Sequence, residues 1–352
     1  MTMRHRLRTG LLRTSAIAAI AFLASAAIST AQSSFQPVRL ARAEPRVDRI
    51  EIHYQANGGQ RRIAFVLLPS SYQPGDDHPL PLVIAPHGLG PGPFLELARL
   101  WGPLPAVGDF AVVIPEGQGR ELAHYSWGYR GQIDDLARMP AIVEGALPWV
   151  RIDPARIYAV GASMGGQETL LLVARYPHLL AGAVSFDAPG DIALRYRQYR
   201  QLEDGAFLQA AMRREVGATP EADPGAYAQR SPLDFTAALA RSNVPLQIWW
   251  STRDRLVVDQ RSHSGRLYSE IKRLNPDAPV QEVVGRWPHT AELRWDSGLP
   301  DALSALGLLP VKRPRAGDCA GWLRPPRAPL SGRGLGATCP LHAELDSREV
   351  PK

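Results

Sequence analysis

Residues 157–170 read IYAVGASMGGQETL and place Ser163 in the motif GASMG at 161–165. An apolar run that predicts a buried strand precedes Ser163, and a segment that predicts a helix follows it. A serine on such a sharp turn can act as a nucleophile, because the glycines two positions to either side relieve crowding. The helix start would also direct the backbone N–H of Met164 toward a developing oxyanion. The chemistry indicated is attack on a carbonyl.

A nucleophilic serine needs a base, and the base needs an acid that orients it. Asp254 follows the predicted strand PLQIWWS at 245–251, and His289 follows the predicted strand PVQEVVG at 279–285. Both strands are expected to be parallel to the strand before Ser163, so their carboxyl ends meet at the same edge of the sheet as Ser163. The chain order serine, acid, histidine is the order that this architecture uses. The sequence therefore predicts a catalytic triad of Ser163, Asp254 and His289.

Two other carboxylates compete with Asp254 for the role of the acid. Asp187 directly follows the apolar run at 181–186, which is a plausible second position. Asp259 precedes a predicted helix that begins at Gln260, where an aspartate is a common cap. Asp254 remains the preferred acid.

A second donor for the oxyanion is expected from the loop after the apolar run LPLVIAP at 80–86. Here the chain continues with His87, Gly88 and Leu89, and a glycine lets the backbone approach the substrate closely. The N–H of Leu89 is the candidate donor beside that of Met164. His87 is an alternative base, but we expect it to fix the loop by hydrogen bonding and to lie near the substrate together with Gly88.

Other polar and aromatic residues have less specific interpretations. Trp127, in HYSWGYRG, and Trp287, two residues before the base, are expected to line an acyl or aromatic substrate pocket. His263 shares a predicted helix with Arg261 and Arg266 and is expected on its solvated face. The nine histidines contain no HExxH pattern, so neither a metal site nor a cofactor is expected.

The pattern of apolar runs predicts the α/β class, with a mostly parallel eight-stranded sheet and helices on both faces. An antiparallel hairpin is predicted at 47–55 and 61–69, around an Asn-Gly-Gly turn. The runs at 80–86 and 110–115 are typical of strands buried on both faces. Further strands are predicted at 156–160, 181–186, 245–251 and 279–285, and helices at 133–150, 164–176 and 260–274.

The first 31 residues have the plan of a secretory signal peptide, with four arginines, an apolar stretch at 16–28 and small residues before Ala31. The apolar stretch is shorter than the ~20 residues that span a bilayer. We therefore expect cleavage after Ala31 and a secreted, periplasmic or cell-surface protein with no membrane span left after cleavage. Residues 32–46 are expected to form a loose lead-in.

The catalytic domain is expected at 47–310, with a small helical excursion at 190–243, just before the strand that precedes the acid. Residues 311–352 are rich in proline, glycine and arginine and are expected to form a weakly ordered tail. The chain's two cysteines, Cys319 and Cys339, lie in this tail. In an exported protein, such a pair is most simply a disulfide.

The formal net charge of +6 belongs to the two ends of the sequence. Residues 1–32 contain four arginines and no acidic residue, and residues 311–352 contain eight basic residues against four acidic ones. The part between them has a net charge of −2. This distribution argues against a nucleic-acid partner.

Four motifs carry a family likeness: HGLG at 87–90, RIDPARIYAVGASMGG at 151–166, Asp254 and WPH at 287–289. From about residue 48 to 296, the chain resembles the α/β-hydrolase superfamily. The likeness is to secreted bacterial esterases of the polyhydroxybutyrate-depolymerase and feruloyl-esterase type and to the prolyl-oligopeptidase catalytic domain. It implies a serine hydrolase. The usual Gly-Xaa-Xaa-Asp before the acid is replaced here by Ser-Thr-Arg-Asp at 251–254.

The expected activity is hydrolysis of a small or medium carboxylic ester through an acyl-enzyme. A peptidase or amidase of the prolyl-oligopeptidase type is the alternative within the enzyme class. A non-catalytic protein with a hydrolase fold, which binds a ligand at the cell surface, is the alternative outside that class. The acyl group, the alcohol and the oligomeric state do not follow from the sequence.

Overall fold

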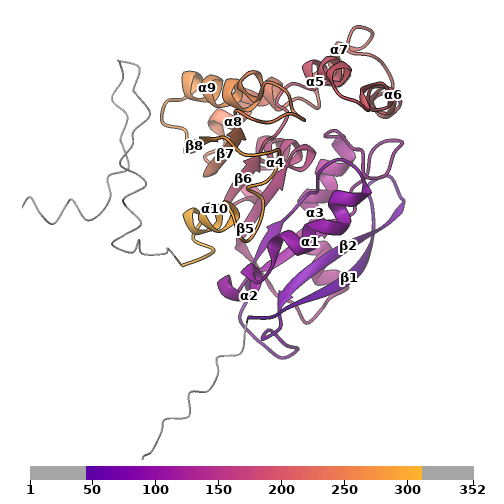
Figure 1. Cartoon of the computed structure of the whole chain (residues 1–352). Coiled ribbons are helices and arrows are strands. Elements are labelled where there is room, and N and C mark those ends of the chain that lie inside the picture. Colours follow the sequence, from indigo (N-terminus) through magenta and orange to yellow (C-terminus); the bar gives the residue numbers. More distant parts are fainter. Residues whose placement is uncertain (1–44, 311–352) are drawn as a thin grey trace, which may run out of the picture. The chain divides into compact units, whose positions relative to one another are not determined.

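The computed structural model describes residues 45–310, which contain one mixed sheet of eight strands (Figure 1). The strand order is β1-β2-β4-β3-β5-β6-β7-β8, and only the β1–β2 and β2–β4 pairs are antiparallel. This confirms the predicted fold class. The strands are β1 (Val47–Gln55), β2 (Arg61–Pro69), β3 (Leu80–Ile84), β4 (Ala111–Pro115), β5 (Ile152–Ala162), β6 (Gly182–Phe186), β7 (Leu246–Ser251) and β8 (Val280–Gly285).

Several predicted segments lie outside the described residues. These are the signal peptide at 1–31, nearly all of the lead-in at 32–46, and the tail at 311–352 with its two cysteines. Within residues 45–310, no helix combines the length and the apolar character that crossing a bilayer requires.

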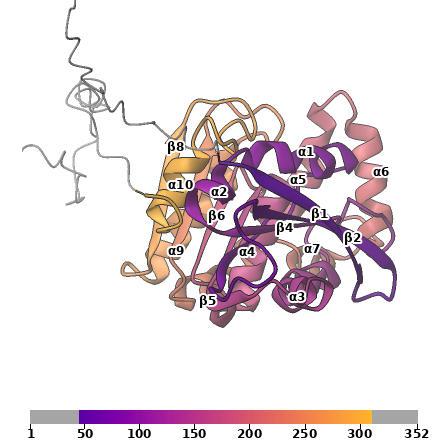
Figure 2. The same cartoon turned by 90° about the horizontal axis from the view of Figure 1, so that it is seen from below.

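The central strands are buried on both faces, as their unbroken apolar sequences predict. Because side chains alternate along a strand, Leu82 and Ile84 of β3 point to one face and Val83 to the other. One face packs against α3 (Arg130–Ala146), α4 (Met164–Arg175), α8 (Thr236–Arg241) and α9 (Ser264–Leu274). The other face packs against α1 (Pro91–Trp101), α2 (Leu104–Gly108) and α10 (Leu299–Ala305). Figure 2 shows these two helical layers on either side of the sheet.

The segment after β6 forms a separate small helical unit. Its elements are α5 (Ile192–Gln198), the 3-10 turn η2 (Tyr199–Gln201), α6 (Gly205–Val216) and α7 (Pro224–Ala228). They enclose their own apolar cluster, which includes Trp127, Tyr196, Tyr199, Met212 and Tyr227. Figure 1 shows α5, α6 and α7 side by side, apart from the helices that cover the sheet.

The end of the predicted excursion belongs instead to the main core. There, η3 (Pro232–Phe235) and α8 pack against α4, and Leu239 and Ala240 are buried in the main cluster. The remaining short turns are η1 (Pro177–Leu179) and η4 (Gln260–Ser262).

Candidate active site

Ser163 occupies the turn between β5 and α4, with a left-handed φ of 57° that is unusual for a residue with a side chain. The backbone N–H of Ser163 donates to the carbonyl of Phe186 at 2.8 Å, which ties the turn to the end of β6. Neither flanking glycine can carry a side chain. A Cβ on Gly161 would lie 2.3 Å from the carbonyl oxygen of Gly165, and one on Gly165 would lie 2.1 Å from that of Pro86. Crowding thus explains the small residues of the GASMG motif.

Two backbone N–H groups beside Ser163 are available to an oxyanion. Met164 is the first residue of α4, where a helix leaves its N–H groups without internal partners. Leu89 lies in the loop after β3, and a Cβ on the preceding Gly88 would lie 3.8 Å from the Cβ of Ser163. Within residues 45–310, neither the Met164 nor the Leu89 N–H donates a hydrogen bond. This pair therefore has the placement that an oxyanion hole requires.

The side chain of His87 fixes this loop. The side chain is buried, with Nε2 2.6 Å from the carbonyl oxygen of Glu116 and Nδ1 beside that of Gly88. Burial lowers the pKa of His87 to about 4, so the imidazole is neutral at pH 7 and has a single N–H to donate. His87 does not line the cavity at Ser163, so the geometry favours a loop-fixing role over that of a base.

The base and the preferred acid are in direct contact. The Nδ1 atom of His289 lies 2.7 Å from Oδ2 of Asp254. The Asp254 carboxylate also accepts the backbone N–H groups of Leu256, at 2.8 Å, and Val257, at 3.0 Å, and the side-chain amide of Gln260. Burial alone would raise the pKa of Asp254, but His289 and these donors more than offset it and lower the pKa. Asp254 is therefore ionised and fixed in orientation.

Asp187, the competing acid, has a different set of partners. One of its oxygens accepts the backbone N–H of Ser251 at 2.9 Å. The other accepts the indole N–H of Trp287 at 3.0 Å and the backbone N–H of Thr290 at 2.8 Å. Burial raises the pKa of Asp187 to about 6. Asp187 lies near the imidazole but accepts no hydrogen bond from it, so it supports the segment that carries His289.

Asp187, Asp254 and His289 form a compact group, with one potential ligand atom from each within 4.8 Å of the others. The oxygens of both carboxylates accept hydrogen bonds from neighbouring N–H groups. The contact between Nδ1 and Asp254 matches an acid that orients a base.

Ser163 and His289 line the same cavity, which has a volume of about 600 Å³. Their side chains share no hydrogen bond, and such contacts often tighten only when substrate binds. Gly88 and Trp127, two of the four expected substrate contacts, also line the cavity. Trp127 is almost fully buried there, and its indole N–H donates to the hydroxyl of Tyr199 at 2.8 Å.

Trp287, the remaining expected contact, does not line the cavity. Its indole donates to Asp187 and packs beside Trp249, with ring centroids 6.3 Å apart. Trp287 therefore holds the segment before His289.

The interpretation of His263 as a solvated residue is wrong. The predicted helix breaks at His263, between η4 and α9, and the side chain turns inward and is completely buried. Its Nδ1 accepts the backbone N–H groups of Gly190 and Asp191, each at 3.2 Å, while Nε2 lies 2.9 Å from the amide oxygen of Gln198. Burial lowers its pKa to about 4. His263 thus ties the start of the helical unit to α9.

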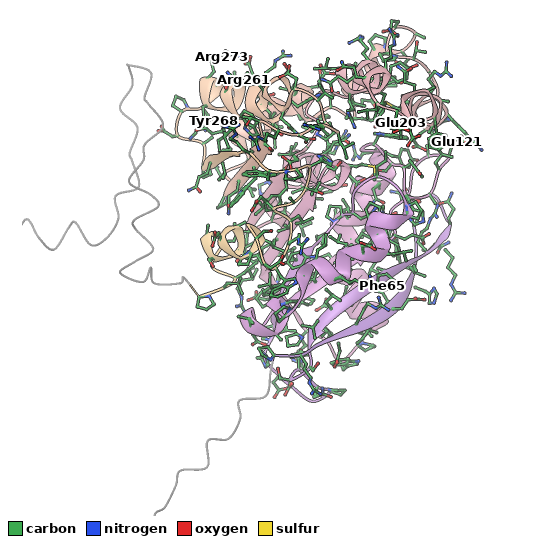
Figure 3. The ribbon with its side chains drawn as sticks, in the orientation of Figure 1. Phe65, Glu121, Glu203, Arg261, Tyr268 and Arg273 are labelled. Carbon is green, nitrogen blue, oxygen red and sulfur yellow. The ribbon has the colours of Figure 1, made fainter. Side chains whose placement is uncertain are left out.

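The charged neighbours Arg261 and Arg266 concealed this contact in the sequence. Both are exposed, and Figure 3 shows the labelled Arg261 at the outer side of the structure. Sequence reasoning also missed Arg195 of α5, which is buried and lines the cavity. Its segment, RYRQYRQLED, is strongly charged and looks like a solvated helix. No local signal distinguishes Arg195 from its exposed neighbours.

No protein-family model matches the chain. It is 30% identical to poly(3-hydroxyalkanoate) depolymerase C of Paucimonas lemoignei over 109 residues, which cover 29% of this chain. The match spans only about a quarter of that relative's length, 26%.

Solved structures cover more of the chain at lower identity. S-formylglutathione hydrolase of Staphylococcus aureus superposes with a TM-score of 0.55 and 18% identity, over 74% of this chain and 99% of that one. The acylaminoacyl peptidase of Pyrococcus horikoshii gives a TM-score of 0.51 and 15% identity, over 69% of this chain and 37% of that one. At these identities the likeness shows the fold alone: the described part of this chain has the α/β-hydrolase fold.

Proposed function

We propose that this protein is a serine hydrolase that cleaves carboxylic esters through an acyl-enzyme. The observation that carries the proposal is the convergence of three elements on one cavity. These are Ser163 on its strained turn, the pair of His289 and Asp254, and two backbone N–H groups without acceptors.

The proposed reaction begins when the Oγ atom of Ser163 attacks the ester carbonyl and His289 Nε2 takes the Ser163 proton. Asp254 accepts the N–H on Nδ1, which keeps Nε2 free as the base and stabilises the imidazolium that forms. The Met164 and Leu89 N–H groups bind the oxyanion. His289 then gives the proton to the departing alcohol. A water molecule, activated by the same imidazole, releases the carboxylic acid and restores Ser163.

An ester is preferred over an amide as the substrate class on two grounds. The curated relative that matches part of the chain is named poly(3-hydroxyalkanoate) depolymerase C, and a poly(3-hydroxyalkanoate) is a polyester. The hydrolase that the chain matches over nearly its whole length is named an S-formylglutathione hydrolase, whereas the acylaminoacyl peptidase is matched over only 37% of its length.

The test compares p-nitrophenyl acetate and butyrate with aminoacyl p-nitroanilides, using the wild-type protein and the Ser163→Ala variant. We expect turnover of both esters, slow or no cleavage of the anilides, and no turnover by the variant. Cleavage of anilides without ester turnover would show a peptidase or amidase. Failure to cleave either class would favour a binding protein. Ester cleavage that survives in Ser163→Ala would show that Ser163 is not the nucleophile.

We also propose that the protein is exported, because four arginines precede the apolar stretch at 16–28 and small residues follow it. Expression of the complete sequence in a bacterial host, followed by fractionation and mass spectrometry, tests this. The expected result is a periplasmic or secreted protein that has lost residues 1–31. An uncleaved protein in the cytoplasmic fraction would contradict it.

A further inference from the structure

The cavity beside Ser163 is mainly apolar, which suits the hydrocarbon parts of an ester. Besides Leu89, six leucines line it, from α1, from the helical unit and from the segments that follow Asp254 and His289. These six are Leu97, Leu100, Leu202, Leu208, Leu256 and Leu293. Apart from His289, the only acidic or basic residues among the described residues that line the cavity are Glu96 and Arg195.

The two charged residues differ sharply in exposure. The Glu96 side chain is 66% exposed and lies 3.9 Å from Arg99, as expected of a solvated surface pair. Arg195, in contrast, is only 7% exposed. A buried guanidinium in an apolar wall is costly unless something compensates its charge.

The Arg195 side chain is held in a defined orientation. Its Cζ atom lies 4.3 Å from the centre of the Tyr199 ring, and that ring is itself fixed by the hydrogen bond from Trp127. One guanidinium nitrogen donates to the backbone carbonyl of Leu256, two residues beyond Asp254. The side chain thus bridges the helical unit and the segment that carries the acid.

Arg195 has no carboxylate partner within residues 45–310. None of the ion pairs found at 4.0 Å or less in this part of the chain includes it. Arg230, which is also 7% exposed, shows the usual solution, because its guanidinium lies 3.4 Å from the buried carboxylate of Glu215. A guanidinium has five N–H donors in a planar fork, and among the described residues Arg195 reaches only the Leu256 carbonyl and the Tyr199 hydroxyl, which leaves most of these donors without an acceptor.

We propose that Arg195 binds a carboxylate carried by the substrate, so that the enzyme prefers esters with an anionic carboxylate over neutral esters of the same length. The inference rests on the proposed function, since it names the substrate class of that same site. A planar guanidinium accepts a carboxylate through two parallel hydrogen bonds, and an apolar surrounding strengthens that contact. The carboxylate would belong either to the acyl chain or to the alcohol.

The experiment measures kcat/KM for two matched pairs of esters. Mono-p-nitrophenyl glutarate against p-nitrophenyl valerate places the carboxylate on the acyl side. The acetate ester of 4-hydroxybenzoate against that of 4-hydroxybenzamide places it on the alcohol side. We expect the wild type to prefer the anionic member of one pair by about tenfold or more, which corresponds to one good charge-assisted contact.

Arg195→Gln is expected to abolish that preference, chiefly by raising KM for the anionic ester. Arg195→Lys, which keeps the positive charge but loses the planar set of guanidinium donors, is expected to retain part of the preference for the anionic ester. Arg200→Gln is the matched control, because Arg200 is exposed in the neighbouring η2 turn and lies outside the cavity. For Arg200→Gln, the ratio of kcat/KM between the anionic and the neutral ester should equal that of the wild type. Far-UV circular dichroism and the Tm establish that each variant is folded.

A binding measurement separates failure of this inference from failure of the proposed function. Free glutarate and 4-hydroxybenzoate should raise the Tm of the Ser163→Ala variant. In the double variant that also has Arg195→Gln, one of the two ligands should no longer raise the Tm. If esters are cleaved but neither anionic ester is preferred, the inference is overturned while the esterase proposal stands. If no ester is cleaved but anion binding depends on Arg195, the site stands and the esterase proposal fails.

Discussion

The carboxylate of Asp187 accepts the backbone N–H of Thr290 at 2.8 Å, directly after the candidate base His289. The same oxygen accepts the indole N–H of Trp287, two residues before the base. One buried side chain directly after β6 therefore holds the backbone after the imidazole and the Trp287 side chain before it. Asp187 and the acid that contacts the imidazole, Asp254, consequently have separable functions.

Asp187→Asn is expected to lower kcat by about 10²-fold, the cost of a small displacement of a catalytic group. An asparagine has the same shape, but its NH₂ group would stand where a carboxylate oxygen now accepts an N–H group. Two donors would then face each other, so the segment around His289 must shift. KM should change little, because Asp187 does not line the cavity. Steady-state kinetics on p-nitrophenyl butyrate measure both constants. A variant with wild-type kcat would show that Asp187 does not position the base.

Asp254→Asn is expected to lower kcat by about 10⁴-fold, because an amide favours the tautomer in which Nε2 carries the proton and cannot accept one from Ser163. Asp259→Asn is the matched control. Asp259 has a left-handed φ of 56°, which asparagine also adopts, and its carboxylate contacts only the hydroxyl of Ser262. The control should keep wild-type kcat. The reverse result would mean that Asp259 is the acid.

Glu168 gives a prediction about stability and pH. The side chain is buried in α4 and accepts hydrogen bonds from Ser126 and Gln132. Burial raises the pKa of Glu168 to about 7, above the value of 4.5 in a model compound. The folded state therefore holds the proton more tightly than the unfolded state. This contribution to stability is complete below pH 4.5 and is lost as pH rises through 7.

The Glu168→Gln variant should not lose this stability as the pH rises, because glutamine resembles the protonated acid. The variant should match the wild type at pH 5 and exceed it at pH 8 by up to about 3 kcal/mol in the free energy of unfolding. Denaturant titrations at both pH values measure the difference. Glu203→Gln, at an exposed position that Figure 3 labels, is the control and should change little at either pH. Equal differences at the two pH values for Glu168→Gln would contradict the assigned cause.

The sequence predicted the parts of the site that depend on strand ends. β5, β7 and β8 are strands that the sequence predicts, and in a parallel sheet their carboxyl ends bring Ser163, Asp254 and His289 to one edge. The glycines of the GASMG motif were predictable for a different reason. The crowding that they relieve is local to the turn.

The missing parts depend on partners far away in the chain. Asp187 is separated from Trp287 by 100 residues and from Thr290 by 103, so no local pattern reveals their contacts. His263 and Arg195 lie in charged segments, and their burial results from packing between the helical unit and the main core. Helices α1, α2 and α10 were also not predicted.

The central claim is that Ser163 is the nucleophile, and a fluorophosphonate probe followed by intact-protein and peptide mass spectrometry tests it most directly. The wild type should gain one probe adduct, located on Ser163, and the Ser163→Ala variant should gain none. Asp254→Asn should react much more slowly than the wild type. A folded wild-type protein that stays unlabelled, or an adduct that persists in Ser163→Ala, would contradict the account.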